Sequence, residues 1–297
     1  MTPRLSILVP VYNAESLLKL KLENLLQVTK RIEGIEVVIS INKSLDNTEK
    51  IARSMLARLP ENFQVFFQPT FLEGVPQFKW LFDNSKGDWV FYSAVDDLLG
   101  MDSLSSVGKT LNLIENEVCL IGSWRFNPPV HGDRLFTLEL SGEKKDRLKE
   151  LFSKIKTANG LFYSIQRREI WLEYWETFGD LGLLDWIMDT LLTLRGQFVQ
   201  LEHMHTTFGA ASPARAPGNI QKSARNFREK ILPYWPMVIA LTRLAKKEGT
   251  KSARQELYQF AISIVFANLH RYFVFQFKKV HDKFTGSLKY LKKKFLM

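Results

Sequence analysis

The sequence predicts an α/β domain with a mostly parallel sheet flanked by helices, followed by a C-terminal helical extension. Over the first 100 residues, short apolar runs alternate with longer segments whose apolar residues recur every three or four positions. This alternation is typical of parallel strands joined by helical crossovers. The run Trp89–Tyr92 is too short for a helix and fits a central strand that is covered on both faces. Beyond residue 220 the spacing of apolar residues is helical throughout.

The expected elements of the first 100 residues follow in a regular order. Strands are predicted over 5–10, 36–41, 63–67 and 89–92. Helices are predicted over 15–28 and from Thr48 to about Leu59, the second being capped by a polar turn. A loop containing Gly74 and Pro76 is expected to lead toward the fourth strand.

The rest of the chain predicts a few more strands and then helices alone. Strands are expected over 118–123, 161–165 and 197–201, and helices over 143–156, 227–232, 236–247 and 250–280. The segment 210–218 is rich in small residues and proline and carries Arg215. Such a segment fits either a mobile lid over a binding site or a linker between domains.

Composition limits the class of protein. The 297 residues are 45% hydrophobic, enough to bury the core of one or two domains. The single cysteine, Cys119, excludes a disulfide framework and fits a reducing cytosol. The apolar start is too short for a signal peptide and lacks its cleavage site. The later stretch 260–277 comes nearest to a transmembrane helix, but it is interrupted by His270 and Arg271. We therefore expect a cytoplasmic protein, with peripheral attachment to the inner membrane face as an open alternative.

The formal net charge of +10 is concentrated toward the end of the chain. A basic surface could attract nucleic acid, anionic lipid or a phosphorylated substrate. The sequence contains no zinc-finger spacing, helix-turn-helix signal or RNA-stacking motif. Nucleic acid is therefore not an expected partner.

Two adjacent carboxylates, Asp96 and Asp97, follow the predicted strand 89–92. In open α/β sheets, ligands bind beyond the carboxyl ends of the strands. Paired carboxylates at such a place favour a divalent cation, Mg²⁺ or Mn²⁺, held together with substrate phosphates. The alternative is a helix cap, because a helix is expected to begin near Asp102 and Asp97 could close the turn before it.

Three segments together resemble family 2 glycosyltransferases of the GT-A fold. They are Leu5–Asn13 with its Pro-Val-Tyr-Asn end, Ser44–Thr48, and Gly87–Val90 leading to the acid pair. The resemblance implies a Rossmann-like catalytic domain over residues 1–215. Its nucleotide-sugar-binding half would cover about 1–100 and its acceptor half about 101–215, followed by a basic helical region over 216–297.

The resemblance also implies roles for single residues. On the donor side, the contacts would come from Pro10, Tyr12, Asn13, Asn42, Lys79 and Asp96. Asp97 would bind the metal ion, Mg²⁺ or Mn²⁺. His203 and His205 follow the predicted strand 197–201, and His205 is the metal-ligand candidate, with a structural role as the alternative for each. Asp185 occupies the place of the general base in the segment Phe178–Trp186.

The sequence departs from the family pattern in three segments. Ile41 stands where the family often has an aspartate that contacts the nucleobase, so the base is either held by other contacts or is not uracil. Ala94 and Val95 precede the acid pair, which leaves only the last two acids of the metal motif. Leu184 replaces the usual glutamate before the base, and Asp189, one helical turn after Asp185, would share its face.

The end of the chain is amphipathic. Lysines lie mostly off an apolar stripe whose residues recur at steps of three and four. The stripe consists of Phe273, Phe277, Val280, Phe284, Leu288, Leu291 and Phe295. Such a helix either packs on its own protein or lies in an anionic membrane interface. The clustered lysines favour the membrane.

These features predict an enzyme that transfers a sugar from a nucleotide-diphosphate sugar to an acceptor hydroxyl, and the resemblance implies that the anomeric centre is inverted. The acceptor would be a saccharide or a lipid-linked glycan, as in capsule or lipopolysaccharide synthesis. Two alternatives remain open. A sugar nucleotidyltransferase would need a glycine-rich phosphate loop after the first strand, which Val11–Glu15 does not offer. A non-catalytic relative would bind nucleotide sugar or membrane without turnover.

Overall fold

The chain divides into two compact units, Met1–Arg215 and Ala216–Met297, in a computed structural model of the full sequence. The structure describes residues 3–30, 32–127, 135–154, 161–179, 181, 184–209 and 234–266. The segment around Arg215, the predicted helix 227–232 and the amphipathic stripe after Phe273 lie outside the described residues.

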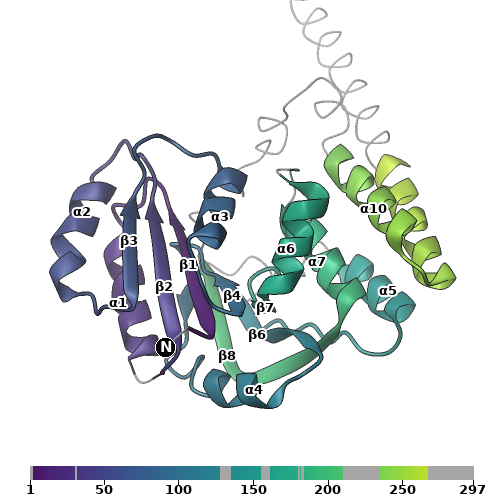
Figure 1. Ribbon diagram of the computed structural model, residues 1–297, viewed down its shortest axis with the longest axis horizontal. Coiled ribbons are helices and arrows are strands. Elements are labelled where there is room, and N and C mark those ends of the chain that lie inside the picture. The colour runs from purple at the N-terminus through teal and green to yellow at the C-terminus, as the bar shows by residue number, and fades with distance from the viewer. Residues whose placement is uncertain are drawn as a thin grey trace, which may run out of the picture. The chain divides into compact units, whose positions relative to one another are not determined.

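One mixed sheet organises the first unit (Figure 1). Within the described residues it has eight strands in the order β3-β2-β1-β4-β7-β6-β8-β5. The strands are β1 (Leu5–Val11), β2 (Ile35–Ile41), β3 (Phe63–Phe67), β4 (Trp89–Tyr92), β5 (Leu98–Leu99), β6 (Glu117–Asn127), β7 (Ile165–Arg167) and β8 (Gln197–Gly209). The four strands β3-β2-β1-β4 are all parallel, and β7 is antiparallel to both of its neighbours. The predicted α/β class is confirmed.

Helices cover both faces of the parallel half. They are α1 (Leu18–Thr29), α2 (Thr48–Met55) and α3 (Gly74–Asp83). The later helices of this unit are α4 (Val107–Leu113), α5 (Lys144–Lys154), α6 (Arg168–Phe178) and α7 (Leu184–Arg195). The crossovers from β1 to β2 and from β2 to β3 run in one direction along the sheet, and the crossover from β3 to β4 runs back. Because such crossovers are right-handed, α1 and α2 lie on one face and α3 on the other.

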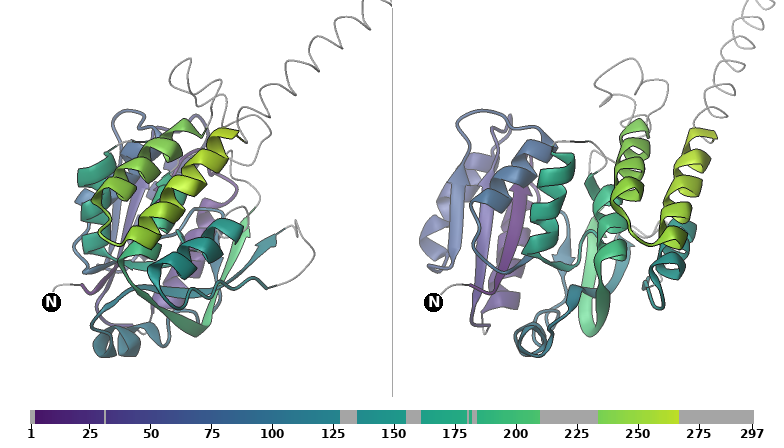
Figure 2. Two further views of the ribbon diagram at one scale, coloured as in Figure 1. Left: turned by 90° about the vertical axis from the view of Figure 1, so that its right-hand side faces the viewer. Right: turned by 45° about the vertical axis from the view of Figure 1, so that its right-hand side comes forward.

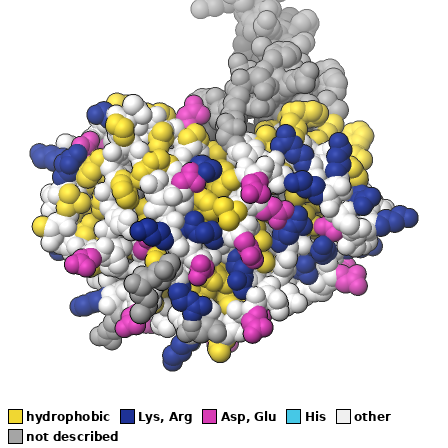
Figure 3. All heavy atoms as spheres, viewed as in Figure 1, with side chains coloured by type: hydrophobic (Ala, Val, Ile, Leu, Met, Phe, Trp, Pro, Cys, Tyr) yellow, Lys and Arg dark blue, Asp and Glu magenta, His cyan; other side chains and the backbone are white. Residues whose placement is uncertain are grey.

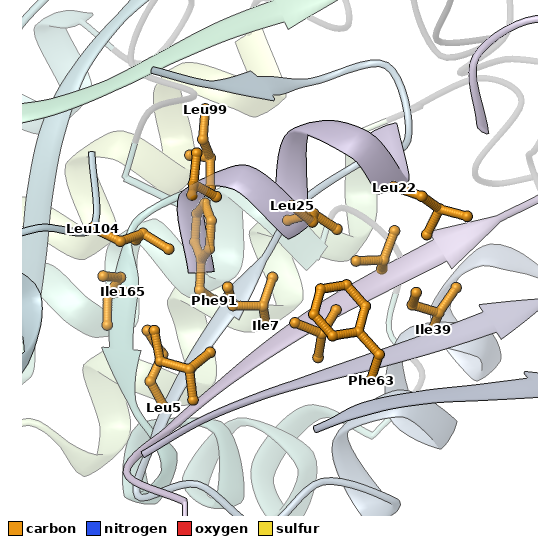
Figure 4. Packing of buried hydrophobic residues seen from close by; sticks show 14 of the residues in the cluster. Leu5, Ile7, Leu22, Leu25, Ile39, Phe63, Phe91, Leu99, Leu104 and Ile165 are labelled. Atoms are coloured by element: carbon orange, nitrogen blue, oxygen red, sulfur yellow. The ribbon is translucent and has the colours of Figure 1, made fainter. Parts of the chain in front are cut away.

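Strand β4 is buried on both faces, and its side chains alternate between two clusters. Trp89 and Phe91 join the core beneath α1, where Phe91 lies near Leu25 and Ile7 (Figure 4). Tyr92 points to the opposite face, where its ring centroid is 4.6 Å from that of Trp171 in α6. Its hydroxyl donates to the carbonyl of Phe78 in α3, at 2.8 Å. Burying a large apolar side chain stabilises the folded state by about 1.5–3 kcal/mol. The packing of its four buried side chains therefore holds this short strand in place.

Three local predictions were wrong. The loop predicted at Gly74 and Pro76 is helix α3, because proline is tolerated in the first turn, where backbone N–H groups have no helical acceptor. The strand predicted over 161–165 begins only at Ile165. The strand predicted to end at Leu201 continues to Gly209 as β8, with β6 as its partner (Figure 2).

The second unit contains two described helices that lie side by side (Figures 1 and 2). They are α10 (Trp235–Lys247) and a helix over residues 251–266. Leu241 and Leu244 of α10 and Leu257 of the second helix are buried, whereas Ile262 and Phe266 are exposed. Within the described part of the chain, no helix has the length and apolar character needed to span a membrane.

Gly87, just before β4, gives a direct test of this packing. A Cβ atom there would lie 2.6 Å from the backbone nitrogen of Ser6 and 2.8 Å from the carbonyl carbon of Leu5. Because backbone cannot move aside as a side chain can, Gly87→Ala should lower the free energy of unfolding by about 1–3 kcal/mol in urea titration.

The matched control is Gly108→Ala in α4, where nothing lies within 4 Å of an added Cβ. Alanine has the higher helix propensity, so this variant should be neutral or more stable by up to about 1 kcal/mol. Equal destabilisation of the two variants would contradict the close approach of residue 87 to β1.

Candidate active site

The loops that follow β1 and β2 are joined by side-chain hydrogen bonds. Asn13 has a positive φ of 46°, and its Oδ1 accepts from the backbone N–H of Leu45 at 2.9 Å. In return, the N–H of Asn13 donates to Ser44 Oγ at 3.1 Å. The next residue, Ala14, donates to Thr48 Oγ1 at 2.7 Å. These bonds align the carboxyl ends of two neighbouring strands, and Asn13 is therefore held in place by the protein itself.

Asn42 is also held by the protein. It is buried, its Nδ2 donates to the carbonyl of Leu72 at 2.7 Å, and its Oδ1 accepts from the backbone N–H groups of Lys43 and Leu72, both at 2.9 Å. Gln77 in α3, which sequence analysis overlooked, donates to the carbonyl of Ser40 at 2.9 Å. The two amides fasten the end of β2 to the loop and helix that follow β3.

The exposed surface at this edge is aromatic. Tyr12 and Phe71 are 39% and 52% exposed, and their ring centroids are 5.0 Å apart. Ile41 is buried and pairs with Phe67 in the sheet, and Pro10 pairs with Ser40. Since Ile41 offers no polar side-chain atom, a flat ligand at this edge would meet ring faces rather than a carboxylate.

Asp96 and Asp97 lie in a turn that connects β4 to β5. Asp97 is only 5% exposed, its backbone N–H donates to the carbonyl of Ala94 at 3.1 Å, and its Oδ1 accepts from the N–H of Gly209 at 3.2 Å. The helix-cap alternative is wrong, because Asp97 leads into strand β5 and the next helix begins only at Val107. We call residues 93–99 the acidic turn.

Asp96 is half-buried, and its Oδ2 is a buried oxygen without a hydrogen-bond partner among the described residues. The end of β8 packs on this carboxylate, since a Cβ atom on Gly209 would come within 2.8 Å of that oxygen. An unpartnered buried carboxylate oxygen is costly unless a cation or donor reaches it. The acid pair therefore fits an oxygen-ligated divalent cation such as Mg²⁺ or Mn²⁺.

Among the described residues, no third His, Cys, Asp or Glu joins the acid pair in a group that could hold a metal ion. His205 lies on β8 beside Gly100, and its Nδ1 forms a short hydrogen bond with Ser123 Oγ. It precedes Gly209 by four residues, which is about 13 Å along an extended strand. The structure does not bring His205 to the acid pair. His203 also lies within β8 and is exposed.

Beneath the acidic turn lies a residue that sequence analysis missed. Lys21 of α1 is fully buried, and its Nζ donates to Ser93 Oγ and to the carbonyl of Asp97, both at 2.6 Å. Burial lowers the pKa of Lys21 to about 8, although the charges of Asp97 and Asp96 oppose this shift. Its helical spacing with the apolar residues of α1 was the only signal in the sequence.

Lys79 lies on α3, and its hydrogen bonds go to Asp83 of the same helix. Its Nζ forms an ion pair with Asp83 at 2.5 Å, one turn further along the helix. It also lies 5.9 Å from the ring centre of Trp175 in α6. Lys79 thus bridges two helices on one face of the sheet, and a donor contact from it stays a prediction.

Asp185 and Asp189 occupy successive turns of α7. Asp185 is half-buried, its Oδ1 accepts from the N–H of Trp186 at 3.0 Å, and burial raises its pKa. Asp189 is 1% exposed with Oδ1 lacking a partner among the described residues, and its pKa is raised well above the ordinary value by burial and then by the charge of Asp185. Of the two residues, Asp185 is the one that keeps exposed surface.

Comparison with known proteins decides the family. The model of glycosyl transferase family 2 matches residues 6–171, which is more than half of the chain. The chain belongs to glycosyl transferase family 2. Membership makes it a nucleotide-sugar-dependent glycosyltransferase, and the predicted family is confirmed. A search among curated proteins finds none that matches the sequence.

Solved structures support the same fold. Residues 1–349 of TarS from S. aureus, bound to UDP-GlcNAc, superpose with a TM-score of 0.64 at 17% identity, covering 90% of this chain and 73% of TarS 1–349. The mannosyltransferase PcManGT from Pyrobaculum calidifontis, bound to GDP-Man and Mn²⁺, gives 0.53 at 15% identity, covering 90% of this chain and 75% of PcManGT. At these identities the likeness shows the GT-A-like fold alone.

In this family 2 glycosyltransferase, the predicted site residues fall into separate groups. Pro10, Tyr12, Asn13 and Asn42 lie together where β1 and β2 end. Asp96 and Asp97 lie beyond the end of β4, the strand that pairs with β1 on its other side. The structure therefore brings six of these predicted residues to one edge of the sheet, whereas Lys79, Asp185 and His205 belong to α3, α7 and β8.

Asp189 of the glycosyltransferase should make stability depend on pH. Its carboxyl group holds its proton to higher pH in the folded state than in the unfolded state, so stability should fall as the pH rises above about 4. Asp189→Asn removes this loss, with each unit of pKa shift corresponding to about 1.4 kcal/mol. The variant should therefore melt at a higher temperature than wild type at pH 7–8 and at a similar one near pH 4.

The matched control is Asp146→Asn, a substitution in α5 at a carboxylate that is not buried. It should leave the pH dependence of the melting temperature unchanged. If Asp189→Asn melted below wild type at every pH, the prediction would be contradicted. The charged form of the carboxyl group would then stabilise the folded protein.

Proposed function

We propose that this glycosyltransferase transfers a sugar, with inversion of the anomeric centre, from a nucleotide-diphosphate sugar to an acceptor hydroxyl. The observation that carries the proposal is the acidic turn at the carboxyl end of β4. Its carboxylates face the same edge of the sheet as the loops after β1 and β2, which is where ligands of open α/β sheets bind. The residues 1–215 would form the catalytic domain.

The donor would lie across this edge. Tyr12 and Phe71 supply exposed ring faces for a nucleobase, and base stacking on such rings tolerates different bases. Pro10 and Asn13 shape the turn after β1, whereas Asn42 acts through its bonds to the loop at Leu72. TarS binds UDP-GlcNAc and PcManGT binds GDP-Man, so both uridine and guanosine diphosphate sugars are reasonable donors to test here.

Asp97 would bind Mg²⁺ or Mn²⁺ at the donor diphosphate, and Asp96 would lie toward the ribose. A cation bound there would neutralise the negative charge that develops on the leaving diphosphate. His205 is left out of this site because its ring is bonded to Ser123 of the neighbouring strand β6, four residues before Gly209 meets Asp97. Lys79 would approach the donor only if it left its ion pair with Asp83.

Asp185 would take the proton from the attacking hydroxyl. A general base works best when its pKa lies near the working pH, and burial raises the pKa of Asp185 in that direction. It lies in the first turn of α7, and the residue is only half-buried. Asp189 is too deeply buried for this role.

A transfer assay with nucleotide sugars and Mn²⁺ tests the proposal. Wild type should hydrolyse or transfer at least one hexose donor. Asp185→Asn should lower kcat by at least about 10²-fold with little change in donor affinity, because the base acts only on the acceptor proton. Asp97→Asn should abolish the Mn²⁺-dependent part of nucleotide-diphosphate binding in calorimetry while the protein stays folded.

Asp102→Asn is the matched control, an exposed aspartate shortly after the acidic turn, and it should behave as wild type. Donor binding without any turnover by wild type would support the alternative of a non-catalytic binder. Near-normal turnover by Asp185→Asn would move the base to another group.

The basic end of the chain would attach the enzyme to the inner face of an anionic membrane, where a lipid-linked or envelope acceptor is available. The exposed Ile262 and Phe266 lie at helical spacing with the later apolar stripe of the sequence. The lysines beside the stripe would each contribute about 1 kcal/mol near such a surface. On the face seen in Figure 3, by contrast, basic and acidic side chains are interspersed.

Co-sedimentation with vesicles tests the attachment. The full chain should bind vesicles containing phosphatidylglycerol, and binding should weaken as salt rises, because charges are screened beyond about 10 Å at 0.1 M. Lys292→Gln/Lys293→Gln should weaken binding several-fold. The control Lys246→Gln/Lys247→Gln removes the same charge from the end of α10 and should not. Equal binding to neutral vesicles, or none at low salt, would contradict attachment by charge.

A further inference from the structure

Lys21 is a charged residue in the middle of an apolar helix face. Leu18, Leu22 and Leu25 of α1 are buried on either side of it, and its own exposed fraction is 0%. Lysine is almost never fully buried unless its ammonium group is paired. A methionine or leucine would fill this position without the cost of removing a charge from water, so the charge itself requires an explanation.

The ammonium group is bonded to the acidic turn from below. It donates to Ser93 Oγ at the start of the turn and to the carbonyl of Asp97, each at 2.6 Å. One turn further along α1, Asn24 accepts from the N–H of Leu99 at 3.0 Å and donates to the carbonyl of Leu99 at 2.8 Å. Helix α1 thus holds the turn at both ends, and Lys21 places a positive charge close enough to interact electrostatically with both carboxylates.

The charges of the site follow from these contacts. Two carboxylates alone would repel each other in a poorly hydrated place, since Asp97 is buried and one oxygen of Asp96 has no hydrogen-bond partner among the described residues. With Lys21 protonated, the turn carries a single net negative charge. A bound divalent cation would convert this into a single net positive charge, which suits a diphosphate. Without Lys21 the loaded turn would be neutral.

We infer that Lys21 is a positioning residue that sets the charge of the acidic turn, so that a divalent cation binds weakly alone and tightly only together with a nucleotide diphosphate. This inference rests on the proposed donor site. The ammonium group keeps the two carboxylates together in the empty site and opposes the entry of a free cation. When the diphosphate is present, the same positive charge attracts it. The diphosphate therefore raises the affinity for the cation more than it would without Lys21.

Calorimetric titration with Mn²⁺ alone, and with Mn²⁺ in the presence of UDP, tests the inference without measuring activity. Lys21→Met keeps the length of the side chain and removes the charge. It should bind Mn²⁺ alone at least about 10-fold more tightly than wild type, because one nearby charge shifts ionic equilibria by one to three powers of ten. The increase in Mn²⁺ affinity caused by UDP should become smaller by a similar factor.

Lys19→Met is the matched control, since Lys19 is an exposed lysine in the same helix. It should leave both titrations unchanged. If Lys21 only supported the shape of the turn, Lys21→Met would bind Mn²⁺ more weakly, with and without UDP. Weaker or unchanged binding of Mn²⁺ alone therefore overturns the inference, as does a wild type that binds no Mn²⁺ at all.

Thermal unfolding in metal-free buffer gives a second test that does not depend on the proposed enzyme. Lys21→Met should lower the melting temperature, and Asp97→Asn should reverse part of that loss, because it removes the carboxylate that the ammonium neutralises. The amide oxygen of the new asparagine can still accept from Gly209. Additive effects of the two substitutions in this cycle overturn the inference. An inactive enzyme that shows the coupling would refute the proposed function and leave the charge balance standing.

Discussion

The parallel pairing of β1 with both β2 and β4 is the constraint on which the site depends. It makes three strands end at one edge of the sheet, and it requires β4 to be buried on both faces although it has only four residues. The side chains of β4 meet this requirement by alternating between the core beneath α1 and the aromatic cluster of α3 and α6. The acidic turn begins where that strand stops, so its position is set by the packing of the whole parallel half.

The acidic turn itself is held by distant parts of the chain. Helix α1 bonds it through Lys21 and Asn24, and β8 closes on it where the N–H of Gly209 meets Asp97. These contacts fix two carboxylates near each other and place one ammonium group under them. The two carboxylates give the turn the negative charge that a cation would need, and the ammonium group of Lys21 reduces that charge by one. Stability and ligand preference at this place therefore depend on one set of contacts.

Much of the parallel half could be predicted because its signals are local. The strands at Phe63–Phe67 and Trp89–Tyr92 have the bounds that their apolar runs indicate. Helix α3 was missed because Gly74 and Pro76 usually mark a loop, and the full length of β8 was missed because its second half carries polar residues. The bonds of Lys21 and Gly209 to Asp97 join residues 76 and 112 positions apart, which no local pattern reveals.

The central claim is that Asp97 at the end of β4 binds the cation that holds a donor diphosphate. Crystals grown with UDP and Mn²⁺ would test it through anomalous scattering measured at the manganese absorption edge. The account predicts one strong anomalous peak between the Asp97 carboxylate and the diphosphate, with the uracil against Tyr12. A manganese peak at His205, or a bound diphosphate with no metal beside Asp97, would contradict it.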